Sequence, residues 1–366
     1  MRHCKDKTRF YRHLLVALLL ALLLPTGSVL AQQSVGTAAV PSAFLLDGFR
    51  YEAQRWNNCG PATLTNALTF FGYTDNQVRA ANWLKPNGED KNVNPQEMVA
   101  YVNTQVPELP VYALMRIGGT LDLLKALIAN RFPVIIEAGY DPPPHDLGWM
   151  GHYLLMIGYD DARREFITHD SYDGASLAYS YEHIETFWRH FNRTYIVVYD
   201  SGREPELLAL LGSDADITQN ALNALETARQ EAAANPEDAF AWFNIGSSYV
   251  ALAPAYQQQA YEYAAVAYDK ARELGLPWRM MWYQFGPLET YNAVGRYQDT
   301  LALTSANLND GGGHWVEETF FYAGVARELM GETTRALDNY RQAVYLNGNF
   351  TAAREARDRL ATAAGG

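Results

Sequence analysis

The sequence predicts an α+β domain followed by an all-helical domain, and three observations support this division. Between about residues 45 and 200, short β-rich runs are mixed with amphipathic segments. After the stretch 200–205, which contains Gly202 and Pro205, β-branched runs give way to Ala, Leu, Glu, Tyr and Arg at helical spacing. Aromatic and small residues then recur at regular intervals. We therefore expect the α+β domain at 32–204 and the helical domain at 205–366.

The N-terminal segment 1–31 has the order of residues found in a secretory signal peptide. Basic residues precede the apolar run 14–24, and small residues follow up to Ala31. The apolar run is shorter than the ~20 residues that cross a bilayer. We therefore expect cleavage near Ala31 and a secreted or cell-envelope protein, with a retained N-terminal membrane anchor as the disfavoured alternative. Cys4 precedes the apolar run rather than following it, so no lipid anchor is expected.

The composition indicates a soluble globular protein and argues against one class of partner. The 366 residues are 48% hydrophobic and 19% charged, which is enough for two ordinary domains. Cleavage after Ala31 would leave 24 basic and 40 acidic residues, a net charge of −16. Nucleic acid is therefore a poor candidate partner. Cys59 would be the one remaining cysteine, so no internal disulfide is expected even though export permits disulfides.

The α+β domain is expected to contain at least four strands and four helices. The strands are predicted at 133–138, 152–159, 165–168 and 194–199, and the helices at 61–71, 94–103, 120–130 and 180–190. We expect the later strands to form an antiparallel sheet.

The second half of the chain carries a repeated pattern of aromatic and small residues. The first copy follows the spacing W-x2-L-G-x2-Y and continues into a second helix, at Trp242, Ile245, Gly246, Tyr249, Ala264 and Tyr268. A later copy keeps better register, at Phe320, Ala323, Gly324, Gly331, Ala336, Tyr340 and Ala343. A degenerate middle copy is suggested by Tyr291, Gly295 and Tyr297. The pattern resembles the tetratricopeptide repeat of about 34 residues, and we expect roughly three units.

The first copy departs from the repeat in length. Gly246 and Ala264 are 18 residues apart, whereas Gly324 and Ala336 are 12 apart. We expect an inserted turn at 253–258 to account for the difference. For the individual residues, the favoured interpretation is a packing seam between helices with no ligand, and a protein partner on the concave surface of the array is a hypothesis.

Cys59 has the surroundings of a catalytic thiol. The polar segment 54–58 precedes it, and Pro61 suits the first turn of the predicted helix. The unpaired N–H groups at a helix N-terminus favour negative charge and thus the thiolate form of Cys59. Gln54 is placed where its side-chain amide could help the Cys59 N–H bind the oxyanion of a tetrahedral intermediate. The alternative, a free cysteine buried as a small hydrophobe, fits these polar neighbours poorly.

His152 and Asp170 form a second candidate element. His152 follows Gly151 at the start of a hydrophobic strand, where its ring can face a helix N-terminus. A turn at 160–161 sends the chain back, and such a hairpin returns Asp170 beside His152. A carboxylate there would fix the imidazole tautomer and stabilise the imidazolium that forms when the base takes a proton. A histidine at a strand end is more often structural than catalytic, so this assignment depends on the joint pattern with Cys59.

These residues together resemble a known family. The pattern consists of Gln54, the run Asn58-Cys59-Gly60-Pro61-Ala62, Gly151-His152 leading a strand that ends Gly158-Tyr159-Asp160, and Asp170. It is similar to the bacterial C39-like peptidases of the papain-like superfamily over about residues 40–200. The resemblance implies a papain-like α+β fold, with Cys59 as nucleophile, His152 as base, Asp170 as the acid that orients the base, and Gln54 in the oxyanion hole.

The best-known members of that family cut bacteriocin leader peptides after a double glycine, inside ABC exporters. This sequence has no transporter-length apolar segment and no G-x-x-x-x-G-K-[ST] loop. The resemblance therefore informs the chemistry more than the substrate.

The sequence thus predicts an exported cysteine peptidase or amide hydrolase that acts on a peptide or protein through a thioester acyl-enzyme, with the helical repeats binding a protein. Two alternatives stay open: a secreted scaffold whose papain-like domain is a non-catalytic binding module, and an acyltransferase in which another amine replaces water. No cofactor is expected. No metal site is expected either, because His145, His152 and His169 lack the H-E-x-x-H spacing.

Overall fold

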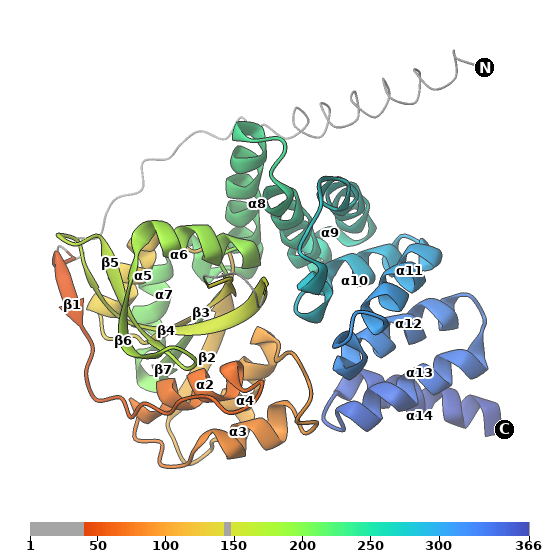
Figure 1. Cartoon of the computed structure of the whole chain (residues 1–366), viewed down its shortest axis with the longest axis horizontal. Helices are drawn as coiled ribbons and strands as arrows, with labels where there is room; N and C mark the ends of the chain where they lie inside the picture. The colour runs from red at the N-terminus through yellow and green to blue at the C-terminus, as the bar shows by residue number, and fades with distance from the viewer. Residues whose placement is uncertain (1–39, 143–147, 366) are drawn as a thin grey trace. The chain divides into compact units, whose positions relative to one another are not determined.

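The computed structural model describes residues 40–142 and 148–365 (Figure 1). The predicted signal segment at 1–31 and His145 lie outside the described residues. Residues 41–203 hold the strands of the described chain and are called the sheet half; residues 204–365 are helical and are called the helical half. In the described residues, no helix combines the length and apolar character needed to cross a membrane.

A single antiparallel sheet forms the centre of the sheet half. Its strand order is β2-β7-β3-β4-β5-β6, and β1 pairs with β4. The strands are β1 (Ala43–Leu45), β2 (Val111–Arg116), β3 (Val134–Tyr140), β4 (Met150–Asp160), β5 (Glu165–Asp170), β6 (Gly174–Ser180) and β7 (Tyr195–Asp200). An antiparallel sheet region followed by a helix-rich region agrees with the coarse fold class expected from the sequence.

The four strands predicted from hydrophobic runs are confirmed as β3, β4, β5 and β7. The prediction missed β1, β2 and β6. Their sequences give a weak signal because β1 has three residues and because β2 and β6, at the two ends of the strand order, leave part of their side chains exposed.

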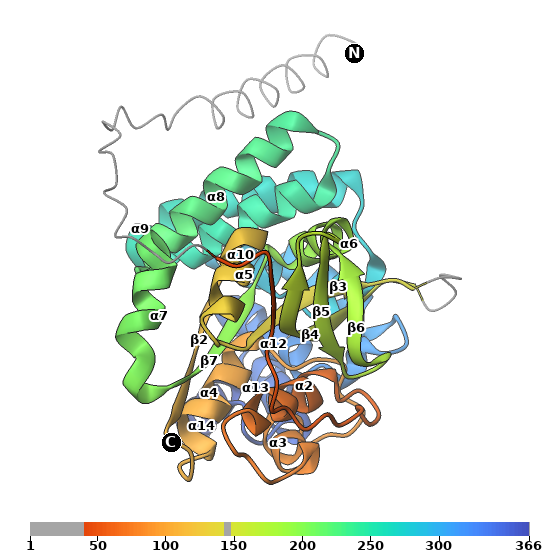
Figure 2. The same cartoon turned by 90° about the vertical axis from the view of Figure 1, so that its left-hand side faces the viewer.

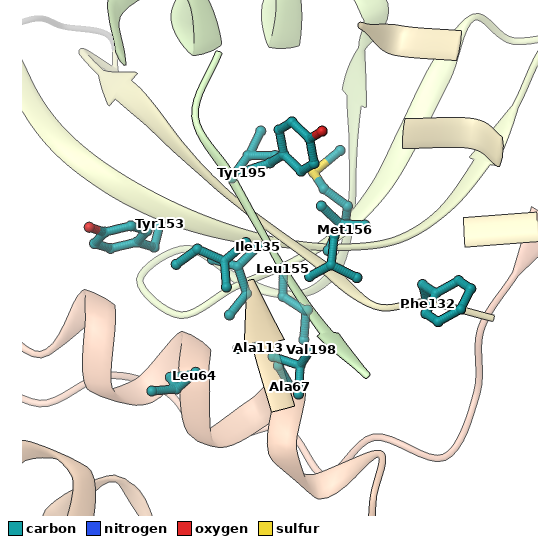
Figure 3. Packing of buried hydrophobic residues seen from close by; sticks show 14 of the residues in the cluster. Leu64, Ala67, Ala113, Phe132, Ile135, Tyr153, Leu155, Met156, Tyr195 and Val198 are labelled. Atoms are coloured by element: carbon teal, nitrogen blue, oxygen red, sulfur yellow. The ribbon is translucent and has the colours of Figure 1, made fainter. Parts of the chain in front are cut away.

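Helices cover the sheet and carry much of its core. They are α2 (Cys59–Thr69), α3 (Gln77–Leu84), α4 (Pro95–Gln105), α5 (Leu121–Ala129) and α6 (Tyr181–Trp188), with α2 and α3 adjacent in Figure 2. The four predicted helices correspond to α2, α4, α5 and α6, and α3 was missed. Helix α2 is buried almost all round. Its Leu64 and Ala67 lie against the strands that carry Ile135 and Leu155 (Figure 3).

A β-bulge in β4 controls which face of the sheet Asp170 joins. The strands β4 and β5 pair in one register near their shared turn and, from Met156 toward the start of β4, in a register shifted by one residue. In the shifted register Asp170 pairs with Leu154. Directly paired residues point to the same face, so Asp170 shares a face with Leu154 and with His152, two residues earlier. In the unshifted register Asp170 would pair with Leu155 and point to the opposite face.

The helical half consists of helices that pack on their sequence neighbours. They are α7 (Glu204–Leu211), α8 (Ile217–Ala234), α9 (Ala239–Leu274), α10 (Gly286–Ala293), α11 (Tyr297–Leu308), α12 (Glu317–Leu329), α13 (Thr333–Leu346) and α14 (Thr351–Gly365). Helix α7 differs from the rest because its Leu207 and Leu211 belong to the core of the sheet half. In α9, Gln257 has non-helical angles (φ 52°, ψ −134°), which confirms the predicted turn at 253–258.

Two glycines of the helical half pack against tyrosines of the following helical segment. A Cβ atom built on Gly246 would lie 2.6 Å from Tyr268, and one built on Gly324 would lie 2.6 Å from Tyr340. Only glycine permits approaches this close. The two pairs occupy equivalent places in the two copies of the sequence pattern.

Polar side chains join the two halves. The Asn94 side chain at the start of α4 donates a hydrogen bond to Glu318 of α12. The Asn347 side chain, which follows α13, donates to the carbonyl of Leu84 at 3.4 Å and to Glu317 at 2.7 Å. The carboxyl groups of Glu317 and Glu318 are both buried.

Candidate active site

The loop before Cys59 is held in place by a side chain from α3. Asn57 adopts a left-handed backbone conformation (φ 54°) just before α2 begins. The side-chain oxygen of Gln77, which is fully buried, accepts hydrogen bonds from the backbone N–H of Arg55 at 2.8 Å and from the Asn58 amide at 3.0 Å. The position of Cys59 at the helix start thus depends on α3, a helix that the sequence pattern did not predict.

His152 and Asp170 are in direct contact. Nε2 of His152 lies 2.8 Å from Oδ1 of Asp170, and the two side chains are 7% and 0% exposed. Asp170 pairs with Leu154, and His152 is the next residue of β4 on that face, so the contact is a diagonal one across two strands.

Asp170 accepts hydrogen bonds from several donors besides His152. Its Oδ1 also accepts from the backbone N–H groups of Tyr172 at 2.8 Å and Asp173 at 3.1 Å. Its Oδ2 accepts from the hydroxyl of Tyr179 at 2.9 Å. Donors aimed at both oxygens stabilise the ionised carboxylate in a buried place.

The surroundings keep His152 protonated and Asp170 ionised at neutral pH. Burial by itself lowers the pKa of His152, but the charge of Asp170, the hydrogen bond between them and the contact with Cys59 outweigh burial and raise this pKa to about 10. Burial by itself raises the pKa of Asp170, but the charge and hydrogen bond of His152, with the backbone N–H groups of Asp173 and Tyr172, lower it to about 2. The pair is therefore an imidazolium beside a carboxylate.

Cys59 lies next to the imidazole ring. Its side chain is partly exposed, and the thiol is among the neighbours that raise the pKa of His152. Because Nε2 of His152 is engaged with Asp170, Nδ1 is the ring nitrogen available to the sulfur. The sulfur therefore lies beside a protonated ring at the N-terminus of α2.

Gln54 is tied to the residue that follows Asp170. Its backbone N–H donates to the carbonyl of Ser171 at 2.7 Å, and its side-chain oxygen accepts from the Ser171 hydroxyl at 3.0 Å. Because the side-chain oxygen of Gln54 is bonded to Ser171, the NH2 group of the carboxamide points away from Ser171. This is the end that an oxyanion site would require.

Two cavities adjoin these residues. One of about 350 Å³ is bordered by His152 and Asp170 and by Tyr140, Tyr179 and His183. The other, beside Cys59, measures only about 10 Å³. This is close to the space that one water molecule needs.

Tyr283 of the helical half borders the small cavity at Cys59. A Cβ atom built on Gly151, the residue before His152, would lie 2.8 Å from Cδ1 of Tyr283. The Tyr283 ring also meets Trp149 edge to face, with ring centroids 5.9 Å apart. The helical half therefore supplies one wall of the site.

Three residues at the site were not found from the sequence: Tyr179, Tyr283 and Glu137. Glu137 borders the Cys59 cavity from β3 and is 5% exposed. A single carboxyl inside the apolar run of β3 was a signal that could have identified it. Tyr179 and Tyr283 have no such local signal, because they reach the site through pairing of β6 with β5 and through packing of the two halves.

Among the described residues, no group of three or more His, Cys, Asp or Glu side chains is arranged to hold a metal ion. His183, on the helix next to the site, stacks on Tyr179 with ring centroids 4.8 Å apart.

Comparison with known proteins connects the sheet half to one family. Residues 46–196 match the model of the Peptidase_C39 like family, which is less than half of the chain but includes Gln54, Cys59, His152 and Asp170. A candidate C39-like peptidase from Bacillus anthracis is similar in structure, with 15% identity, a TM-score of 0.34, and coverage of 43% of this chain and 97% of that one. No curated protein matches the chain. Residues 46–196 of the sheet half are thus C39-like in sequence, and the match ends before the helical half begins.

Proposed function

We propose that the protein is an exported cysteine peptidase or amide hydrolase in which Cys59, His152 and Asp170 act as a catalytic triad. The observation that carries the proposal is the 2.8 Å contact between His152 and Asp170, on a ring that also contacts Cys59. The match of residues 46–196 to the Peptidase_C39 like family supports it independently.

In the proposed reaction, the Cys59 thiolate attacks the carbonyl carbon of the scissile amide. The Cys59 N–H and the Gln54 amide stabilise the resulting oxyanion. The His152 imidazolium gives its proton to the departing amine nitrogen as the C–N bond breaks, which leaves a thioester on Cys59. His152 then takes a proton from water, the hydroxide attacks the thioester, and the acid product departs. Asp170 keeps the ring oriented and stabilises its charged form.

Alkylation kinetics test the triad without knowledge of the substrate. In the full chain carrying Cys4→Ser, Cys59 is the single thiol, and we expect iodoacetamide to alkylate it readily at pH 6. His152→Ala should confine alkylation to the pH range in which ordinary thiols ionise. His183→Ala, a matched change of a nearby histidine, should leave the pH profile unchanged. An ordinary profile that His152→Ala does not alter would contradict the proposal.

Turnover tests the reaction itself. We expect Cys59→Ala to abolish cleavage of a peptide library and Gln54→Ala to lower it by about 10²–10³-fold, the usual effect of losing one oxyanion donor. Addition of a primary amine separates hydrolysis from acyl transfer, since an amide product in place of the acid would identify an acyltransferase.

A second candidate function, a non-catalytic binding module, is favoured by one observation. The cavity at Cys59 holds about 10 Å³ and is bordered by Tyr283, so it leaves little room for a peptide bond beside the sulfur. Tyr283→Ala distinguishes the two functions. Faster alkylation of Cys59 in this variant supports a covered enzyme site, whereas an unreactive thiol in both proteins supports the binding module.

We further propose that the helical half is a degenerate tetratricopeptide array that binds a protein partner. The equivalent Gly246–Tyr268 and Gly324–Tyr340 contacts support a common hairpin unit. Export is likewise a proposal, based on the sequence of residues 1–31. Mass measurement of the protein recovered from outside the cytoplasm tests it, with a new N-terminus at residue 32 as the expected result.

A further inference from the structure

A cavity of about 760 Å³ lies between the two halves and shares two lining residues with the small cavity at Cys59. Glu137 and Tyr283 border both this cavity and the small one at Cys59. The volume falls within the range of roughly 300–1,000 Å³ that is usual for ligand sites. A molecule bound in the large cavity would therefore contact two residues that also border the cavity of the nucleophile.

The walls of this cavity are acidic and aromatic. Glutamates from four separate elements border it: Glu97 of α4, Glu137 of β3, Glu289 of α10 and Glu318 of α12. In the part of the chain that the structure describes, its lining contains no Lys, Arg or His. Aromatic side chains also border it, among them Trp83, Phe191, Phe285 and Tyr322. Carboxylates and ring faces are the two groups that bind organic cations.

Glu318 is buried in the cavity wall, with one carboxyl oxygen unpaired in the described part of the chain. It is 5% exposed, and while one oxygen accepts from the Asn94 side chain, its Oε2 has no hydrogen-bond partner among the described residues. A buried carboxyl oxygen without a donor is costly. A cationic donor that enters the cavity would remove this cost.

We propose that the cavity binds basic side chains of a peptide substrate, with an ammonium or guanidinium group between Glu318 and Glu289 and the peptide continuing past Glu137 to Cys59. The inference names the substrate class of the proposed peptidase and rests on that function for the placement of the scissile bond.

The electrostatics of the empty cavity agree with this inference. Burial, with the charge of Glu317, raises the pKa of Glu97 to about 8. Burial raises the pKa of Glu137 and of Glu318 well above the ordinary value. The neutral forms of these carboxyl groups are therefore favoured at neutral pH, and a cation beside them would supply the opposite charge that favours ionisation. Basic Lys91 borders only the small cavity at Cys59, where its Nζ lies 3.7 Å from Glu89.

Binding to the full chain carrying Cys59→Ala tests the inference apart from turnover. The probes are three fluorescein-labelled peptides of equal length in which Lys, Gln or Glu alternates with Gly, followed by anisotropy. We expect the Lys peptide to bind at least about tenfold more tightly than the Gln peptide, a difference of about 1.4 kcal/mol. The Glu peptide should bind least.

Isosteric variants locate the binding. Glu318→Gln and Glu289→Gln should each weaken binding of the Lys peptide about tenfold, which is a typical effect of losing one charge partner. Glu355→Gln, an exposed site on α14, is the matched control and should have no effect. Glu289→Gln keeps an acceptor for the Tyr261 hydroxyl, so it serves if Glu318→Gln fails to fold.

The outcomes separate this inference from the proposed function. Equal binding of the Lys and Gln peptides, or Lys-peptide binding that neither cavity variant weakens, would overturn the cationic site. Binding of the Lys peptide that wild-type protein never cleaves would keep the site and overturn the peptidase. Cleavage by wild-type protein without any preference for basic residues would keep the peptidase and overturn the cationic site.

Discussion

Asp170 in the sheet half and Glu318 in the helical half are both buried carboxyl groups, yet their pKa values shift in opposite directions. Burial raises the pKa of both, but at Asp170 the neighbouring imidazolium and three further donors reverse the effect. At Glu318 the charges of Glu317 and Glu97 add to burial. The comparison shows that neighbouring charges and hydrogen-bond donors, rather than the extent of burial, decide whether a buried carboxyl group is ionised.

This difference separates two kinds of site. In the sheet half, the charged groups of one hairpin satisfy each other and form a charge pair that exists without ligand. Between the halves, the carboxyl groups are close together and one oxygen of Glu318 lacks a donor. The first arrangement suits chemistry, and the second suits the binding of a cation.

Removal of Asp170 should have the largest effect. Asp170→Ala leaves the buried His152 ring without its partner, and loss of one partner of a buried pair costs about 3–5 kcal/mol. Urea denaturation at pH 6 measures this as a lower free energy of unfolding. Asp173→Ala, which removes the neighbouring carboxyl but leaves its backbone N–H in place, is the matched control, and an equal loss in both variants would contradict the pairing.

The same pair predicts a pH dependence. The folded pKa of His152 is raised from 6.5 to about 10, so its contribution to stability is complete below pH 6.5 and is lost as the pH rises through 10. The folded pKa of Asp170 is lowered from 3.8 to about 2, so its contribution is complete above pH 3.8 and is lost as the pH falls through 2. The stability difference between wild type and Asp170→Ala should therefore be greatest between pH 3.8 and 6.5. A difference independent of pH would count against this assignment.

Tyr179→Phe tests how much one hydrogen-bond donor contributes to the stability of the Asp170 carboxylate. It removes the hydroxyl that donates to Oδ2 of Asp170, a hydrogen bond to a charged group that is worth about 1.5–3 kcal/mol. Less stabilisation of the carboxylate should also raise the pKa of Asp170, which NMR titration of its carboxyl carbon would follow. An unchanged titration would mean that the phenol contributes packing alone.

A substitution in the helical half should lower the stability of the protein without changing the reactivity of Cys59. Gly324→Ala places a methyl group 2.6 Å from Tyr340, and overpacking of this kind costs about 1–3 kcal/mol. Gly348→Ala, where the nearest atom lies 4.0 Å away, is the control. We expect a lower melting temperature for Gly324→Ala only, with the alkylation profile of Cys59 preserved. A changed profile would show that the two halves are more tightly coupled than these contacts indicate.

The last prediction concerns Glu97, on the cavity side of the comparison. Its folded pKa is raised from 4.5 to about 8, so the stability associated with its neutral form is present below pH 4.5 and is lost as the pH rises through 8. Glu97→Gln should flatten this part of the stability profile, since glutamine can still accept from Asn94 in the helix cap. If the stability of wild type and of Glu97→Gln changed with pH in the same way, the carboxyl group of Glu97 would not be buried in its neutral form.

The sequence alone determined the features that depend on neighbours a few residues apart. Pro61 and the polar run before it placed Cys59 at a helix start, and short hydrophobic runs located the central strands. The extra spacing between Gly246 and Ala264 located the break at Gln257. These signals are local because turn and helix-start chemistry act within one or two turns of the chain.

Only the tertiary structure decided how these pieces meet. The bulge in β4 put Asp170 on the same face as His152, and a shift of one residue would have separated them. Gln77 fixed the loop at Cys59, and Tyr283 arrived from the helical half. A strand's hydrophobic pattern has a period of two and reveals neither a bulge nor a partner far along the chain, so such contacts depend on packing between distant segments.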